Sequence, residues 1–244
     1  MKQSFCPIAT IKAGHFFCYD EDNNTITIIN GKKHYVINKK TKRIPQELEE
    51  FFDLNKNFSF LEQHPELQPY NNIRLVRQDL RQAILTFITT ANNNQKRIKK
   101  LLDALRSLGE ELSPGVKTLP KDFSEEQLRN LGFGYRAKTL AQTNQLLTEE
   151  FLEKIRQSNE EEQRALLLTL PGVGPKVADC ILAYSELASP YAFPQDVWVL
   201  RAVKRRHKLK NYSYNYVRAF AKKRFKEHAS YIQHYYFLDE QNKK

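Results

Sequence analysis

The hydrophobic pattern of this chain changes its period near Asp79, and this change limits the possible folds more than any other feature of the sequence. Before it, residues 15–38 are rich in β-branched and aromatic residues, and Asn30-Gly31 is placed as the turn of a hairpin between two strands. After it, apolar residues recur at helical spacing, beginning with Ala83, Ile84, Phe87 and Ile88. We therefore expect a mainly α-helical body preceded by a small antiparallel β-rich part, α+β overall.

Capping signals indicate where the helices begin. Asp79 can cap the first helix of the body, and a second apolar face follows at Ile98, Leu101, Leu102 and Leu105. Capping-box spacing precedes further helices at two places, Ser124 with Gln127 and Ser158 with Glu161. Pro45 is expected to open a short helix over residues 45–54, and we interpret residues 64–72 as a connection. We place the domain boundary there, with a β-rich domain over residues 1–70 and a helical body over 71–244.

The chain is strongly basic, with 39 Lys and Arg against 28 Asp and Glu and a formal net charge of +11. Residues 201–210 alone carry six Lys or Arg and no acid. Such a cluster favours a polyanionic partner, because neutralising phosphates releases condensed counterions. From charge alone, a basic surface that is merely solvated is an equally good interpretation.

Cysteine usage and hydropathy indicate the compartment. Three cysteines, Cys6, Cys18 and Cys180, are spaced without close pairing, which argues against a secreted disulfide framework. The first residues, MKQSFCPIATIK, lack the apolar core of a signal peptide. No run approaches the roughly 18 apolar residues that a membrane-spanning helix needs. We therefore expect an intracellular, soluble protein without a membrane partner.

The stretch TLPGVGPKVADCILAY predicts a helix, a glycine turn and a second helix. Residues 160–168 form the first helix, PGVG at 171–174 breaks it, and Pro175 suits the first position of the next helix because its missing N–H would be unpaired there. Gly172, Val173 and Gly174 would let the backbone approach a phosphate closely at the free N–H groups of the new helix. Such a hairpin grips a DNA backbone without reading bases. A structural helix connection is the alternative that the turn alone favours.

Lys176 lies one residue inside the second helix, where the positive end of the helix dipole disfavours an ammonium. The neutral amine is a nucleophile for carbon electrophiles and can form a Schiff base. Asp196 follows a proline-bearing loop and precedes an apolar helix, so it can serve as an N-cap. Its carboxylate can also face the same cavity as Lys176, assist deprotonation and stabilise positive charge on a sugar. The alternative for Lys176 is a solvent-facing lysine on a basic protein.

Taken together, LPGVGPKVADCI and PQDV resemble the signature of helix-hairpin-helix DNA glycosylases. The variant with lysine is similar to the 8-oxoguanine DNA glycosylase/AP lyase family. Residues 71–98 and 128–140 also resemble that family in the right order, so the resemblance covers most of residues 70–237. The stretch KAGHFFCY resembles the family's smaller β domain more weakly.

The resemblance implies the roles of individual residues. Lys176 would be the nucleophile and Asp196 its carboxylate partner, acting on a nucleotide flipped from the duplex. The vacated space would be filled, and the orphaned cytosine contacted, by Asn92, Arg97, Tyr135 and Arg136. The lesion base would be held by Gly14, whose carbonyl accepts the N7 hydrogen of an oxidised purine, and by Cys180, Gln233 and Phe237. Tyr135 and Arg136 could instead be an ordinary helix start, and Gln233 and Phe237 core and surface positions of a last helix.

Two departures from related patterns limit the resemblance. Trp198 stands where the family commonly has a histidine near the DNA phosphates. Relatives with the same hairpin, such as endonuclease III, carry four cysteines for an iron–sulfur cluster, which three scattered cysteines cannot supply. We therefore expect neither a metal nor a redox cofactor.

These implications describe a bifunctional glycosylase/AP lyase of base excision repair. Lys176 would attack C1′ of an oxidised guanosine, preferentially opposite cytosine, expel the base and pass through a Schiff base to β-elimination. The expected partner is double-stranded DNA containing oxidised guanine. We expect a monomer located inside the cell with the DNA, which is the cytoplasm or nucleoid if the host is prokaryotic. Two alternatives stay open: a noncatalytic helix-hairpin-helix DNA-binding module, and a glycosylase for another damaged base.

Overall fold

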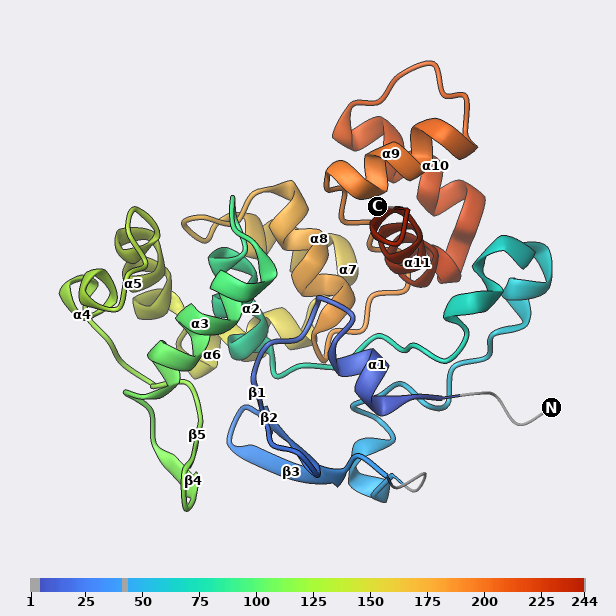
Figure 1. Ribbon diagram of the computed structural model, residues 1–244. Coiled ribbons are helices and arrows are strands. Elements are labelled where there is room, and N and C mark those ends of the chain that lie inside the picture. Colours follow the sequence, from blue (N-terminus) through green and yellow to red (C-terminus); the bar gives the residue numbers. More distant parts are fainter. Residues whose placement is uncertain (1–4, 41–43, 244) are drawn as a thin grey trace.

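A computed structural model describes residues 5–40 and 44–243 of the chain (Figure 1). Residues 1–4, part of the stretch considered for a signal peptide, lie outside the described residues. The chain begins with a short helix that the sequence did not predict, α1 (Pro7–Ile11), and continues into an antiparallel sheet of β1 (Tyr19–Glu21), β2 (Thr25–Asn30) and β3 (Lys33–Asn38) in the order β1-β2-β3. The predicted β-rich beginning is therefore present.

The hairpin turn between β2 and β3 lies one residue later than predicted. Asn30 pairs with Lys33, so the two-residue loop is Gly31-Lys32, with Gly31 at φ +59°. Asn30 stays in the strand because its side chain is used elsewhere: its Oδ1 accepts the backbone N–H of Asp79 at 2.6 Å. The sheet is thereby attached to the start of the helical body.

The segment between the sheet and the body is built from three 3₁₀ helices, η1 (Gln46–Leu48), η2 (Ser59–Gln63) and η3 (Pro65–Tyr70). The helix expected after Pro45 is thus confined to one short 3₁₀ turn, and the expected connection at 64–72 is itself largely helical. Proline lacks a donor and is tolerated in such short turns. The buried Leu48, Leu61 and Leu67 fix the segment against the core.

The rest of the described chain is helical apart from one small hairpin. It contains α2 (Leu80–Thr89), α3 (Gln95–Arg106), β4 (Glu111–Ser113), β5 (Val116–Lys117), α4 (Glu125–Asn130), α5 (Arg136–Leu146), α6 (Glu149–Gln157), α7 (Glu160–Leu168), α8 (Pro175–Tyr184), α9 (Val197–Arg206), α10 (Tyr214–Phe225), η4 (Lys226–His228) and α11 (Ala229–Gln241). None of the described helices is long and apolar enough to cross a membrane.

Of the caps predicted at Asp79, Ser124 and Ser158, the first two are confirmed. The Asp79 carboxylate accepts the N–H of Gln82 at the start of α2, and Ser124 and Gln127 form a reciprocal capping box at α4. The box expected at Ser158 and Glu161 was wrong by one residue, because Asn159 caps α7 with Glu162. Asparagine caps as well as serine, and Ser158 already ends α6, where its hydroxyl donates to the carbonyl of Lys154.

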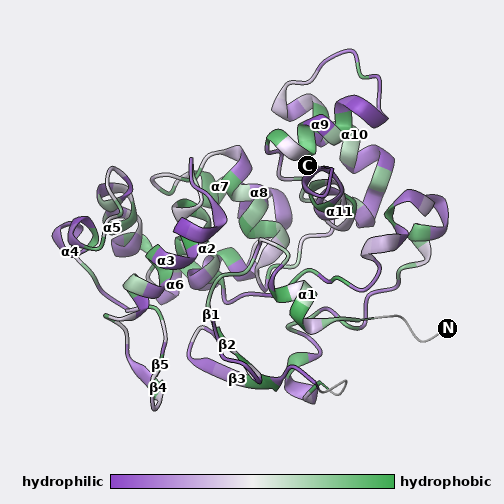
Figure 2. Ribbon diagram, in the orientation of Figure 1, coloured by the Kyte–Doolittle hydropathy of each residue, from purple (hydrophilic) through white to green (hydrophobic). Residues whose placement is uncertain are grey.

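The helix α2 lies at the centre of the body and packs against α3, α5 and α8. Nearly all of its residues are buried, as expected for a helix that neighbours cover on every side. In Figure 1, α8 lies between the group that contains α2 and α3 and the group α9–α11, and Figure 2 shows its hydrophobic residues in the middle of the molecule. One hydrophobic cluster joins residues of the sheet to residues of the helices. Because the two parts share this cluster, the domain boundary predicted at residue 70 remains a proposal.

Candidate active site

The predicted hairpin is present between α7 and α8, and the structure shows why its turn needs glycine. Gly172 has φ +80°, and a Cβ there would lie 2.3 Å from Cγ2 of Thr139 on α5. The carbonyl of Pro171 accepts the Thr143 hydroxyl at 2.7 Å, which ties the same turn to α5. Gly174 is the N-cap of α8, Pro175 is its first residue, and no side chain caps it. The first backbone N–H groups of α8 therefore have no side-chain acceptor, and N–H groups at such a helix start can bind an anion.

A buried carboxylate fixes the direction of α8. Asp179 is fully buried within that helix and accepts Nε of Arg164 on α7 at 2.8 Å and the hydroxyl of Tyr214 on α10 at 2.6 Å. Three helices are thereby joined at one residue, three positions after Lys176. Sequence reasoning missed this anchor, although an acid inside the apolar run VADCILAY was a signal that it needs a buried cation.

Both predicted catalytic residues line one cavity of about 780 Å³. The cavity lies among the loop before β1, the α2–α3 connection, α8, the start of α9 and α11, and seven predicted site residues line it: Gly14, Asn92, Lys176, Cys180, Asp196, Gln233 and Phe237. Residues distant in the sequence thus come together around Lys176. Their roles remain predictions.

Asp196 is the N-cap that the sequence predicted. One of its oxygens accepts the N–H groups of Trp198 at 2.9 Å and Val199 at 2.8 Å. Burial raises the pKa of its carboxyl, while those N–H groups and the positive charge of Lys176 oppose the rise. A carboxylate that burial destabilises beside a cation is suited to take up a proton or to face a new positive charge.

Cys180 lies one turn after Lys176. Burial raises the pKa of its thiol to about 11, against the opposing effect of the Lys176 charge. The side chain is therefore a neutral thiol at physiological pH. It offers the cavity a soft apolar surface rather than a nucleophile.

Gly14 closes the cavity from the amino-terminal side. Its φ is +86°, and a Cβ would lie 2.4 Å from Nε2 of Gln95 and 3.4 Å from the ring of Phe237. The left-handed backbone conformation is what favours glycine here, since the Gln95 side chain could move away from a Cβ. The wall formed by Gly14 and Phe237 is therefore built by elements from both ends of the chain.

The four residues predicted to face the opposite strand lie around the α2–α3 connection. Tyr135 is 62% exposed, and the Arg136 guanidinium lies over its ring at 4.3 Å. Arg136 itself is buried and donates to the carbonyls of Ala91 and Asn92. Arg97 reaches the carbonyl of Gly132 at 3.5 Å. Arg136, to which the resemblance assigns a contact with cytosine, thus uses its Nε and Nη2 here to hold the Ala91–Asn92 backbone at the rim of the cavity, where Asn92 has φ +48°.

The basic run at 201–210 is only partly available to a polyanion. Arg205 and Arg206 form ion pairs with Asp239, and further ones with Glu240 and Glu66 respectively. Within the described parts of the chain, the other basic residues of the run form no ion pair: Arg201, Lys204, Lys208 and Lys210. Trp198 lines the cavity, and the Arg201 guanidinium lies 5.0 Å from the centre of its ring. Trp198 therefore contributes an aromatic face where the resemblance suggests an imidazole.

Sequence reasoning missed a polar cluster at the inner end of the cavity. The Tyr184 hydroxyl lies 2.8 Å from Oε1 of Gln233 and 3.1 Å from Nδ1 of His234, and all three residues line the cavity. Nothing in the sequence indicated that α8 and α11 pair at these positions. The sequence did indicate that Tyr184, at the end of an apolar helix, would need a hydrogen-bond partner for its buried hydroxyl, but not which residue that partner is.

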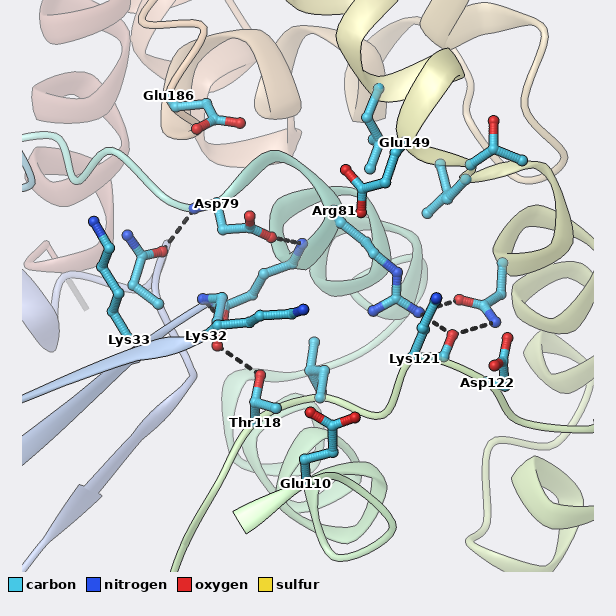
Figure 3. Close-up of a pocket in the computed structure, with 18 of the residues that line it drawn as sticks. Lys32, Lys33, Asp79, Arg81, Glu110, Thr118, Lys121, Asp122, Glu149 and Glu186 are labelled. Carbon is cyan, nitrogen blue, oxygen red and sulfur yellow. Dashed lines mark hydrogen bonds between the residues drawn. The ribbon is translucent and has the colours of Figure 1, made fainter. Parts of the chain in front are cut away.

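A second cavity, of about 830 Å³, lies at the amino end of α2 (Figure 3). It contains none of the predicted site residues, and its lining mixes cations such as Lys32 with acids such as Glu149. Arg81 on its wall already donates to the carbonyls of Pro120 and Lys121. This cavity therefore offers neither the lysine nucleophile nor the lesion-binding residues that were predicted and that line the first cavity.

Within residues 5–40 and 44–243, no group of three or more His, Cys, Asp or Glu could hold a metal ion.

Comparisons with known proteins agree with the resemblance. No family model matches the chain. It is 41% identical over 129 residues to a probable N-glycosylase/DNA lyase of Methanothermobacter thermautotrophicus and 39% identical over 142 residues to N-glycosylase/DNA lyase OGG1 of Arabidopsis thaliana. Each match covers 52% of this chain, and 41% and 38% of those proteins. The chain therefore spans about two fifths of the length of the curated relatives it matches.

Solved structures extend the agreement to nearly the whole chain. The 8-oxoguanine glycosylase/lyase of Clostridium acetobutylicum, in complex with double-stranded DNA containing cytosine opposite 8-oxoguanine, has a TM-score of 0.86 and 26% identity, covering 99% of this chain and 93% of that one. Endonuclease III bound to DNA has a TM-score of 0.52 at 18% identity over 75% of this chain and 85% of that one, which shows the fold alone. The predicted fold class and family resemblance are confirmed: this is the helix-hairpin-helix glycosylase fold with a small antiparallel sheet.

Proposed function

We propose that this chain is a bifunctional DNA glycosylase and AP lyase that excises 8-oxoguanine, preferentially opposite cytosine, in base excision repair. The observation that carries the proposal is the cavity in which Lys176 and Asp196 meet beside the helix-hairpin-helix turn. The names of the relatives supply the reaction class, N-glycosylase/DNA lyase, and one neighbour supplies the lesion and the base opposite it.

The proposed reaction uses residues of this chain alone. The Lys176 amine attacks C1′, a bond forms between its nitrogen and that carbon, and the glycosidic bond breaks with its electron pair leaving on the base. Asp196 stabilises the positive charge that develops on the sugar and accepts the proton that the amine loses. The nitrogen lone pair then forms the C=N bond of a Schiff base as the C1′–O4′ bond breaks, and O4′ takes back the proton held by Asp196. In β-elimination the released base anion takes a proton from C2′, the C2′–C3′ double bond forms, and the 3′ phosphate leaves with the electrons of the C3′–O bond.

The cavity supports extrusion of the target nucleotide. C1′ is inaccessible in stacked DNA, so the nucleotide must leave the helix before Lys176 can reach it. Gly14, Cys180, Gln233 and Phe237 line the cavity and offer a close backbone, a neutral thiol, an amide and an aromatic ring. We propose that they hold the oxidised base, and that Gly172, Val173 and Gly174 hold the DNA backbone at the start of α8. We propose a monomer that acts where the DNA is.

The opposite-base preference is tested by single-turnover excision from duplexes carrying 8-oxoguanine opposite each of the four bases. Asn92 lies on the rim of the cavity, Arg136 donates to its carbonyl, and Arg97 and Tyr135 lie nearby around the α2–α3 connection. We propose that the two guanidinium groups exchange their carbonyl partners for cytosine when DNA binds. A mismatched contact costs roughly 1 to 3 kcal/mol, so excision opposite cytosine should be about ten- to a hundredfold faster than opposite adenine. Arg136→Ala should narrow that ratio.

The same assay separates the alternatives. No base release from any duplex, with binding retained, would indicate a noncatalytic DNA-binding module. Release of another damaged base in preference to 8-oxoguanine would keep the chemistry and change the substrate. Equal rates opposite cytosine and adenine would contradict the role proposed for Asn92, Arg97 and Arg136.

A further inference from the structure

The amide of Gln233 is held in one orientation by Tyr184. The Tyr184 hydroxyl lies 2.8 Å from Oε1 of Gln233, an oxygen without hydrogen, so the tyrosine must be the donor. The amide nitrogen of Gln233 has no hydrogen-bond partner among the described residues. The NH₂ end of the amide is therefore the end that remains for a ligand in the cavity.

His234 supports this direction of donation. Burial raises the pKa of Tyr184 well above its usual value and lowers the pKa of His234 well below its own. At neutral pH the phenol thus keeps its single hydrogen and the imidazole is uncharged. Since the Tyr184 hydrogen goes to Gln233, the 3.1 Å contact with His234 requires Nδ1–H of His234 to donate to the tyrosine oxygen.

Packing prevents Tyr184 from turning away. Its ring is stacked against His15, at 4.8 Å between ring centres, and against Phe87, at 5.6 Å. His234 meets the same ring edge-on at 5.6 Å. A buried side chain with three rings packed against it cannot change rotamer without displacing its neighbours, so the hydroxyl is a fixed reference point for Gln233.

We propose that Tyr184, supported by His234, is a positioning residue that fixes the Gln233 amide with its NH₂ group toward the base, and that this selects an oxidised purine with an oxygen at C6. The inference rests on the proposed function and adds a determinant of specificity to it. Tyr184 does not touch the reacting atoms. It acts through Gln233.

The chemistry of two oxidised purines makes the proposal specific. 8-Oxoguanine and 8-oxoadenine share the N7–H and the C8 carbonyl, so a contact with N7–H does not separate them. They differ on the pairing edge, where guanine presents the acceptor O6 and adenine presents a donor amino group at the same place. A Gln233 NH₂ that cannot rotate donates to O6 of 8-oxoguanine, whereas with 8-oxoadenine it faces the amino group, so that two donors oppose each other.

The test compares single-turnover excision of 8-oxoguanine and 8-oxoadenine, each opposite cytosine, by wild type and Tyr184→Phe. Wild type should prefer 8-oxoguanine. Without the hydroxyl the amide can rotate by half a turn and offer its oxygen instead, so the ratio of the two rates should fall about tenfold, equivalent to about 1.4 kcal/mol. A merely structural role would slow both reactions and leave the ratio unchanged.

Two controls isolate the mechanism. Tyr235→Phe removes a comparable buried hydroxyl from α11, one that donates to the carbonyl of Ile73 at 2.8 Å outside the cavity, and should leave the ratio at its wild-type value. In a Gln233→Ala background, Tyr184→Phe should cause no further loss of preference, because the residue through which it acts is gone. Thermal unfolding of each variant checks that the proteins are folded.

The outcomes distinguish this inference from the proposed function. An unchanged ratio in folded Tyr184→Phe, or a drop that persists in the Gln233→Ala background, overturns the inference and leaves the glycosylase activity standing. Release of neither base by wild type overturns the proposed function itself, and the inference with it. A fall in the ratio that depends on Gln233 supports both.

Discussion

At the scale of the residue, Asp196 combines a structural and a chemical task on one carboxylate. One oxygen caps α9 through two backbone N–H groups, while burial raises the pKa of the group beside Lys176. The two tasks are separable, because capping needs only an oxygen acceptor, whereas stabilising a positive sugar needs the negative charge. Its capping role was predicted from its place before an apolar helix. That it shares a cavity with Lys176 was stated only as a possibility, because the packing of α8 against the start of α9 is not written in the local pattern.

Asp196→Asn should therefore lower turnover far more than stability. The amide oxygen keeps the cap, so the free energy of unfolding should change by less than about 1 kcal/mol. The loss of charge should slow single-turnover excision by about 10²-fold or more. Excision rates and denaturant unfolding of the same preparation check this, and a folded variant with the wild-type rate would leave Asp196 a cap only.

At the scale of the element, the hairpin between α7 and α8 has one glycine that the backbone requires and one that it does not. Gly172 has φ +80° and faces the methyl group of Thr139, whereas a Cβ at Gly174 would meet open space. The sequence pattern predicted this turn and the first residue of α8 correctly. It could not predict that Asp179 would join Arg164 and Tyr214, because that ion pair depends on how three helices pack.

Gly172→Ala and Gly174→Ala form a matched pair that tests this account of the turn. The first should lower the free energy of unfolding by about 1–3 kcal/mol, from the left-handed conformation and the clash with Thr139. The second should cost only a few tenths of a kcal/mol to about 1 kcal/mol, since it alters an N-cap that already lacks a side chain. Urea unfolding measures both, and equal losses would show that the conformation of Gly172 is not what constrains the hairpin.

At the scale of the whole molecule, the candidate site is assembled by elements that join both ends of the chain (Figure 1). Gly14 precedes the sheet, Lys176 begins α8, and Phe237 lies on α11, yet all three line one cavity. Local patterns predicted most of the helices and the hairpin. The later turn at Gly31 and the contact of Tyr184 with Gln233 escaped prediction because each is decided by partners distant in the sequence. The cap at Asn159 escaped for a local reason, because adjacent Ser158 and Asn159 are both good caps and Ser158 ends α6 instead.

The central claim, that Lys176 forms a covalent bond with the sugar, is tested most directly by borohydride trapping. A duplex with 8-oxoguanine opposite cytosine is incubated with wild type, Lys176→Gln and Lys154→Gln, the last changing an exposed lysine of α6 outside the cavity. Reduction fixes a Schiff base as a stable protein–DNA product, so wild type and Lys154→Gln should give it in equal amounts and Lys176→Gln should give none while still binding the duplex. An undiminished covalent product with Lys176→Gln would contradict the account and place the nucleophile at another residue.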